Sequence, residues 1–185
     1  MSKVQERTVI VDEAKQAFNS IKETDIESFV TSIQKAKKIF IYGLGRERLM
    51  LQAFAMRLMH LGLNVHVVGD VTTPKIDRGD LFITSSGTGY LSTVDALLPI
   101  AVKSGADVVY MTANPESELS HYATHTILIE AQTMKVNVEE RSSLQPMGAV
   151  FEQAQLFLYE WLIILLKDRG SITDEQMEGY HTNLE

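Results

Sequence analysis

The sequence predicts an α/β fold in which an open, five-stranded parallel sheet is covered by helices on both faces. Two observations support this prediction: apolar, β-prone runs alternate with segments of helical periodicity, and two of the strands lead directly into glycine turns. Right-handed crossovers would bring both turns to the carboxyl edge of the sheet. A chain of 185 residues that is 45% apolar can bury one good core, so we expect a single domain overall.

Residues 1–38 are predicted to form a helical leader that packs on the main domain, which spans residues 39–185. Within the leader, apolar residues recur near helical spacing from about residue 9 to residue 37. The pattern breaks around Thr24 and Asp25, and either side chain would cap a second helical segment.

The main domain alternates strands with helices. Strands are expected at residues 39–42, at 65–68, from residue 81, at 107–111 and at 126–129. Helices are expected at residues 49–61, 90–104 and 148–167. Gly62 and Gly105 follow the first two of these helices, where glycine commonly ends a helix. Residues 116–122 would form a short helix or loop, and the polar stretch 130–145 predicts a long loop of the kind that often carries function.

The composition excludes several classes of partner and site. A net charge of −7 argues against a nucleic-acid partner, which requires a broad basic face, but it allows a small anion held by local donors. The chain has no cysteine, which rules out disulfides, thiolate metal sites and a thiol nucleophile. The first residues lack the apolar core of a signal peptide, and the most apolar run, residues 156–166, is shorter than a membrane span. We expect a soluble, cytoplasmic protein with no membrane partner.

One stretch, residues 81–89, changes abruptly from an apolar run to Ser85, Ser86, Gly87 and Thr88. Small residues let the backbone approach an anion closely, and short hydroxyls with free N–H groups replace the water that a phosphate loses. The helix that follows would add its positive N-terminal end. The same residues are also compatible with ordinary turn and capping chemistry. The stretch is therefore a candidate phosphate-binding loop.

A second glycine turn, which contains Gly43 and Gly45, follows the first strand. If both turns lie at the carboxyl edge of the sheet, they become neighbours around one crevice, which favours the phosphate interpretation. Arg46 stands at this turn, where it would either pair with a ligand anion or be solvated. A dinucleotide fingerprint is disfavoured, because Arg48 stands where the third glycine of G-x-G-x-x-G is required.

Two titratable residues stand at predicted helix ends. His60 lies in the last turn of its helix, where a histidine often only favours the negative helix end. Glu152 lies in the first turn of the final helix, where the positive helix end stabilises a carboxylate. Spacing alone assigns neither residue a catalytic role. His121 and His125 flank a strand without metal-ligand spacing, so we expect no metal site.

Several longer motifs occur together in this chain. They are Gly43-x-Gly45-Arg46, residues 54–62, Val68-Gly69-Asp70, Thr73-Pro74, Gly79-Asp80, Gln145-Pro146-Met147-Gly148 with Phe151-Glu152, and His181-x-Asn183-Leu184-Glu185. This set resembles the 6-phospho-3-hexuloisomerase family, which is built on the sugar isomerase (SIS) domain, from about residue 39 to residue 185. The resemblance implies a three-layer α/β/α sandwich with a five-stranded parallel sheet and a homotetramer with sites at subunit contacts. It also implies interconversion of 3-hexulose 6-phosphate and fructose 6-phosphate.

The resemblance implies roles for individual residues as well. Glu152 would be the base that removes a proton to form an enediol, His60 the acid or proton shuttle, and His181 a further catalytic candidate. The sugar phosphate would be held by residues of the two turns, namely Gly43, Gly45, Arg46, Ser85, Ser86, Gly87 and Thr88. No metal or redox cofactor is required, since hydrogen-bond donors can stabilise the enediol.

Both ligand loops depart from the family pattern. Glu47 and Arg48 stand where the family usually has Ser-Gly, and Tyr90 and Leu91 where it usually has Glu-Thr. A carboxylate beside a phosphate lowers the affinity unless an arginine offsets its charge. Two alternatives therefore stay open: an isomerase for a different phosphosugar, or a sugar-phosphate sensor without chemistry. A third alternative, an oligomerisation domain, is suggested by apolar residues of the final helix, namely Leu156, Leu162, Ile163, Leu165 and Leu166.

Overall fold

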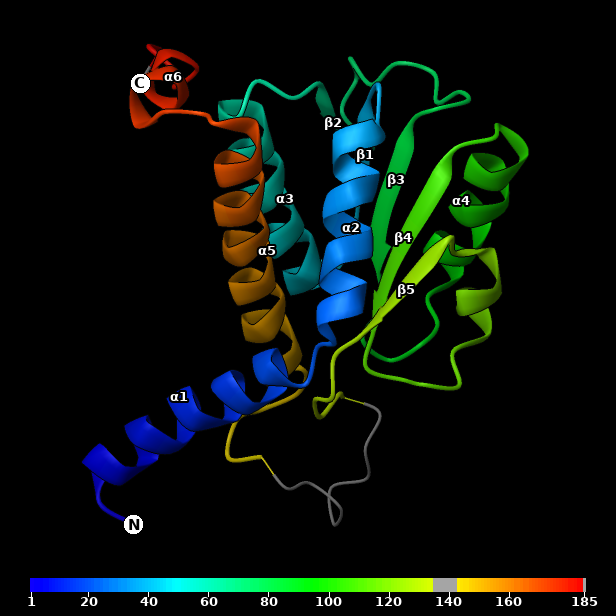
Figure 1. The fold of residues 1–185 in the computed structure, drawn as a ribbon. Coiled ribbons are helices and arrows are strands. Elements are labelled where there is room, and N and C mark those ends of the chain that lie inside the picture. Colours follow the sequence, from blue (N-terminus) through cyan, green and yellow to red (C-terminus); the bar gives the residue numbers. More distant parts are fainter. Residues whose placement is uncertain (135–142, 185) are drawn as a thin grey trace.

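Five short strands rich in apolar, β-branched and aromatic residues form one parallel sheet in the computed structural model, which describes residues 1–134 and 143–184. The strands are β1 (Ile39–Tyr42), β2 (Val65–Val67), β3 (Leu81–Ser85), β4 (Asp107–Thr112) and β5 (His125–Leu128). Their order is β2-β1-β3-β4-β5, and every neighbouring pair is parallel. With helices on both faces (Figure 1), this confirms the predicted α/β/α sandwich.

The direction of winding reverses between β1 and β3. Tyr42 pairs with Thr84, so the segments that leave these two strands emerge side by side at the carboxyl edge of the sheet. In open α/β sheets, this reversal point is where a crevice for ligands forms. The predicted proximity of the two glycine turns is therefore confirmed.

Helices of different lengths cover the two faces. They are α1 (Lys3–Asn19), α2 (Glu23–Lys35), α3 (Gly45–His60), α4 (Ser92–Lys103), α5 (Ala149–Gly170), α6 (Asp174–Gly179) and the 3-10 helix η1 (Glu118–Tyr122). The two sheet faces form separate cores: α2, α3 and α5 pack on one face, and α4 with η1 on the other. Along β3 the side chains alternate between them, with Leu81 and Ile83 in the first core and Phe82 in the second. Figure 1 shows α1 extending away from the sandwich beyond the base of α5.

Helix α2 belongs to the core of the sandwich. Phe29, Val30 and Ile33 on its inner face are completely buried against the sheet and α5. The break before it falls at residues 20–22, and its N-cap position is Lys22, which makes no side-chain cap. The predicted cap at Thr24 or Asp25 is therefore wrong, because the apolar face requires helix from Glu23 onward.

Other helix bounds also differ from the predictions. Helix α3 starts at Gly45, immediately after the turn, and α4 starts at Ser92 rather than at residue 90. Helix α6 was not predicted, because it is short and exposed. Its capping box, made by Thr173 and Gln176, stabilises its first turn without an apolar face. The predicted loop at 130–145 has no helix or strand in its described parts, and residues 135–142 lie outside the described residues.

Helix α5 is the central helix of the protein. By length and hydropathy its 22 residues would suffice to cross a membrane, although the apolar run at 156–166 covers only the middle of the helix. However, 56% of its most apolar window is buried inside the fold, and it packs against α1, α2 and α3. We therefore describe α5 as the core helix of a soluble protein.

The apolar residues of α5 divide between the core and the surface. Leu162, Ile163 and Leu166, which suggested an oligomeric contact, are buried in the core of their own chain. The apolar side chains that α5 exposes are instead Phe157, Trp161 and Ile164.

Candidate active site

The turn after β1 places α3 at the crevice. Gly45 has φ +55°, a conformation that side chains disfavour, and it forms the first residue of the helix. At Gly43, a Cβ atom would lie 2.6 Å from Leu51 Cδ1, so a larger residue would push the turn away from the helix. These two glycines bring Arg46 and Glu47, in the first turn of α3, to the carboxyl edge of the sheet.

The loop after β3 is tied to β4 and packed on α5. The Ser86 amide donates to the Met111 carbonyl at 3.0 Å, and the Gly87 carbonyl accepts from the Ala113 amide at 3.2 Å. A Cβ atom on Gly87 would lie 2.9 Å from Phe151 Cδ1. The loop therefore contacts α5 closely, immediately before Glu152.

Two buried hydroxyls form hydrogen bonds with the backbone of this loop. The Tyr110 hydroxyl lies 3.0 Å from Ser117 Oγ and donates to the Ser86 carbonyl at 3.4 Å. Ser117 Oγ donates to the carbonyl of Gly89 at 2.5 Å. These supporting residues were not predicted, because Tyr110 has the pattern of an ordinary strand residue and Ser117 lies in a loop.

A pocket of about 430 Å³ opens between the start of α3, the β3 loop and the start of α5. Its lining residues are Leu44, Gly45, Arg46, Glu47, Thr88, Leu91, Met134, Pro146, Met147, Gly148 and Glu152. Most of the wall is apolar, and two carboxylates with one guanidinium supply its charge. This composition is typical of a small-ligand site.

Glu152 and Arg46 form an ion pair in this pocket. Glu152 Oε2 lies 2.9 Å from Arg46 Nη1, and the side chains are 16% and 51% exposed, respectively. Burial raises the pKa of Glu152, and the charge and hydrogen bond of Arg46 partly oppose that rise. Glu152 is therefore a carboxylate whose basicity is increased in a partly dry pocket.

The Glu47 carboxylate accepts two hydrogen bonds from the end of β3 and the loop that follows it. The Ser85 hydroxyl donates to Glu47 Oε2 at 2.5 Å, and the Gly87 amide donates to Oε1 at 3.1 Å. Burial raises the pKa of Glu47, against the lowering effect of these two hydrogen bonds, and the nearby charge of Glu152 raises it further.

The other predicted phosphate-binding residues lie in the same loop. Ser86 is fully buried, and its Oγ has no hydrogen-bond partner. Thr88 lines the pocket, and its hydroxyl donates weakly to the Tyr90 carbonyl at 3.3 Å. The structure therefore brings Gly45, Arg46, Thr88 and Glu152 to one pocket, with Ser85, Ser86 and Gly87 beside it.

His60 and His181 lie together at the opposite end of α3. Their rings stack with centroids 5.2 Å apart, and Arg57 Nη1 lies 3.4 Å from His60 Nδ1. Burial, Arg57 and His181 all lower the pKa of His60, which favours the neutral imidazole. His60 lies 13 steps along the helix from Glu47, which is roughly 20 Å at 1.5 Å per residue. Within one chain, the structure does not bring either histidine to Glu152.

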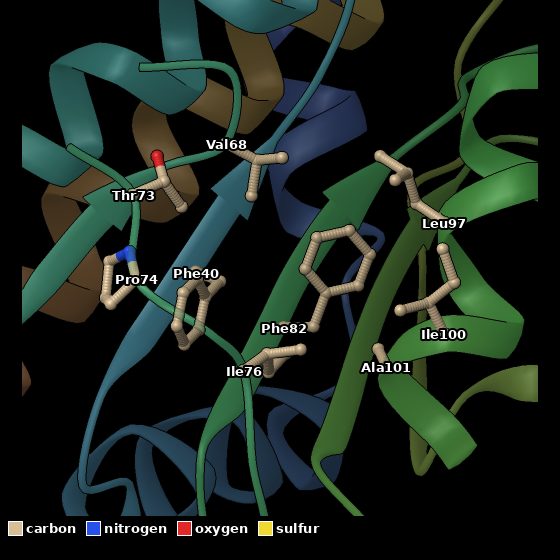
Figure 2. A pocket seen from close by; sticks show the side chains of 9 residues that line it. All are labelled: Phe40, Val68, Thr73, Pro74, Ile76, Phe82, Leu97, Ile100 and Ala101. Atoms are coloured by element: carbon tan, nitrogen blue, oxygen red, sulfur yellow. The ribbon is translucent and has the colours of Figure 1, made fainter. Parts of the chain in front are cut away.

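A second pocket lies on the other face of the sheet (Figure 2). Figure 2 shows Phe40 and Phe82 at its floor, α4 on one side, and the β2–β3 loop with Thr73 on the other. The Thr73 hydroxyl donates to the Val67 carbonyl, so the side-chain hydroxyl in this wall is already engaged. This pocket does not contain any of the predicted site residues.

No metal site emerges from the part of the chain that the structure describes. Among residues 1–134 and 143–184, no three histidine, aspartate or glutamate side chains gather as ligands for a metal ion.

One protein-family model matches most of this chain. The SIS domain model matches residues 32–164, which is most of the sandwich. The chain belongs to the SIS domain family. The match begins within α2, in agreement with the place of that helix in the core of the SIS domain.

Individual relatives are similar over nearly the full chain. A 3-hexulose-6-phosphate isomerase from Methylomonas aminofaciens is 33% identical over 185 residues, which is 100% of both chains. A 3-hexulose-6-phosphate isomerase from Bacillus subtilis is 33% identical and covers 95% of each chain. A solved structure from Methanococcus jannaschii, described as inferring a function of 3-hexulose-6-phosphate isomerase, has a TM-score of 0.85 at 29% identity and covers 98% of this chain and 99% of the other.

Proposed function

We propose that this SIS domain is a sugar-phosphate isomerase that interconverts 3-hexulose 6-phosphate and fructose 6-phosphate. The observation that carries the proposal is the position of Glu152, a carboxylate of raised pKa beside a glycine- and hydroxyl-rich loop. A base next to an anion-binding loop fits a reaction that transfers protons on a phosphorylated sugar. The named function of the full-length relatives supports the same substrate.

The reaction moves a carbonyl group from C3 to C2 of the sugar. Glu152 would remove the proton from C2, and protonation of O3 would then give a neutral enediol. Loss of the proton from the C2 hydroxyl and delivery of a proton to C3 complete the ketose with its carbonyl at C2. The raised pKa of Glu152 brings its basicity closer to neutrality, where a general base is most effective.

The second acid–base group would come from another copy of the chain. No histidine is among the residues that line the described pocket. His60, with a pKa lowered to favour neutral imidazole, suits proton transfer between the sugar oxygens, and His181 lies against it. We include a cytoplasmic homotetramer in the proposal, with α1 and the exposed side of α5 as contact surfaces. Val4 and Val11 of α1 and Trp161 of α5 are exposed apolar residues there.

A coupled assay for fructose 6-phosphate tests the proposal. The wild-type chain should produce fructose 6-phosphate from 3-hexulose 6-phosphate. Glu152→Gln should reduce kcat by about 10² or more, because general base catalysis contributes 10² to 10⁴, while binding of fructose 6-phosphate persists. Glu23→Gln, which changes an exposed carboxylate in the first turn of α2, should leave turnover unchanged.

Two outcomes would contradict the proposal. Turnover of Glu152→Gln within about tenfold of wild type would remove Glu152 from the role of base. Stabilisation of the wild type by sugar phosphates without any turnover would instead favour a sensor.

A further inference from the structure

The Glu47 carboxylate makes the contacts that a bound anion would make in the β3 loop. One oxygen accepts the Ser85 hydroxyl and the other accepts the backbone amide of Gly87. A short hydroxyl and a glycine amide after a parallel strand are the donors that phosphate groups use. In this chain, the Glu47 side chain of α3 accepts both hydrogen bonds.

The other polar groups at this site are either already paired or left without a hydrogen-bond partner. Arg46, the cation nearest to the crevice, is engaged by Glu152 at 2.9 Å. The Ser86 hydroxyl is fully buried without a hydrogen-bond partner, and an unpaired buried hydroxyl is costly. The loop thus combines donors already used by Glu47 with one that is left unsatisfied.

We propose that Glu47 is an internal competitor for the anion-binding loop and that it selects against free phosphate and sulfate. To bind, the phosphate group of a ligand must displace the carboxylate from Ser85 and Gly87, because both negative charges cannot share these donors. This proposal rests on the function proposed above for the phosphate site.

The competition discriminates between small and large anions. Free phosphate gains only the loop donors, and these offset little more than the contacts that it removes from Glu47. A sugar phosphate also contacts the wall of the 430 Å³ pocket, so it has additional binding free energy with which to displace the carboxylate. Glu47 therefore lets the loop distinguish a phosphosugar from the inorganic anion.

Calorimetric titration with sulfate tests the proposal, since sulfate remains a dianion throughout the neutral pH range. Glu47→Ser, which removes the carboxylate, should bind sulfate at least about tenfold more tightly than wild type, or about 1.4 kcal/mol. Glu47→Gln keeps the size of the side chain and an acceptor oxygen for the Gly87 amide, so its affinity should be intermediate. Glu23→Ser removes another carboxylate from a helix first turn and should leave sulfate affinity within about twofold of wild type. A thermal melt of each ligand-free variant verifies that it is folded.

Equal sulfate affinity in wild type, Glu47→Ser and Glu47→Gln would overturn the proposal, as would a gain of the same size in Glu23→Ser. A second titration series with fructose 6-phosphate should show that the preference for the sugar phosphate over sulfate shrinks in Glu47→Ser. These readouts need no turnover. An inactive wild type that shows the expected sulfate affinities would therefore contradict the isomerase function and leave the role of Glu47 supported.

Discussion

Two opposing influences act on the carboxylate of Glu152. Burial disfavours its ionised form, while Arg46 at 2.9 Å favours it. Because Arg46 is half exposed, its charge is partly screened by solvent, and burial determines the net direction. The pKa of Glu152, the proposed base, therefore depends on one neighbouring cation, Arg46, which can be replaced without disturbing the core.

Replacing Arg46 by methionine should move the acid limb of the kcat/KM profile to higher pH. The substitution removes the influences that lower the pKa of Glu152, so this pKa rises, and a base that must be ionised then loses activity at a higher pH. The profile of the variant, measured beside wild type and Arg48→Met, gives the position of the limb independently of any change in its height. An acid limb that stays in place or moves to lower pH would disprove the assignment.

Glu47 makes folding stability depend on pH. Burial raises its pKa above the usual range of a glutamate in the folded state, so folding favours the protonated form. The contribution of Glu47 to stability is therefore complete below the unfolded pKa and is lost as the pH rises through the folded pKa.

Glu47→Gln should remove this dependence, because the amide stays neutral at every pH. The Tm of the variant relative to wild type should increase as the pH is raised from about 4 to 8. Differential scanning fluorimetry across this range, with Glu23→Gln as the exposed control, measures the difference. A difference that is constant with pH, or that falls as the pH rises, would show that the carboxylate is not penalised by burial.

The β3 loop and α5 are in contact through one glycine. A Cβ atom on Gly87 would lie 2.9 Å from the ring of Phe151, which is itself 1% exposed. The ring cannot move aside freely in a packed core, so the loop and the helix must be fitted to each other. The same residue places its amide on Glu47, which connects packing with the site.

Gly87→Ala should therefore destabilise the protein by about 1 to 3 kcal/mol, the usual cost of overpacking. Urea denaturation measures this loss, and Phe151→Leu in the same chain should recover part of it, because the two sites share one contact. Gly179→Ala is the matched control: a Cβ atom there meets nothing within 4 Å, so stability should be unchanged or slightly higher. Equal stability of Gly87→Ala and wild type would show that the loop can retreat from α5.

The elements that the sequence predicts well are those with a strong local signal. Buried strands read as apolar runs, and Gly62 and Gly105, both with positive φ, follow the helices that they were expected to close. Helix α6 escaped prediction because its stability at the start comes from a capping box rather than from an apolar face. The cap of α2 was misplaced because tertiary burial, and not the best capping residue, determined where that helix starts.

The site was predictable where it follows from topology. The meeting of the two glycine turns follows from parallel strands and right-handed crossovers, whereas Glu152 was named only through the resemblance to the SIS isomerase family. The hydrogen bonds that Glu47 accepts from Ser85 and Gly87 were not predictable, because they depend on the rotamer of one side chain in a crevice between two loops. The distance of His60 from Glu47 was present in the sequence, since an unbroken helix between them must separate them by roughly 20 Å.

The whole molecule presents its chemical groups at two ends. Glu152 lies at the carboxyl edge of the sheet, and His60 with His181 lies at the far end of α3, where Tyr180 packs near Gly62. Under the proposed function, a complete acid–base pair would therefore require two copies of the chain, with the pocket of one meeting the histidines of another.

Subunit mixing tests this arrangement. Glu152→Gln and His60→Gln should each be inactive alone. After denaturation and refolding as an equal mixture, about a quarter of the sites should combine an intact Glu152 with an intact His60, and activity should return to about that fraction of wild type. The coupled assay measures the recovery, and light scattering before mixing measures the size of the assembly.

A mixture of Glu152→Gln with Glu152→Ala is the control and should stay inactive, since no site can be repaired. A monomer at micromolar concentration, or a mixture without recovered activity, would rule out a shared site and require the second acid–base group to come from the same chain.

Helix α3 has a consequence for how such proteins can diverge. It starts at the pocket and ends at the histidines, so its 16 residues determine both the span and the angular offset between the two groups. Insertion of a single residue would rotate His60 by about 100° relative to the pocket and lengthen the span by about 1.5 Å. We therefore expect α3 to tolerate substitutions of exposed side chains but not the gain or loss of a residue.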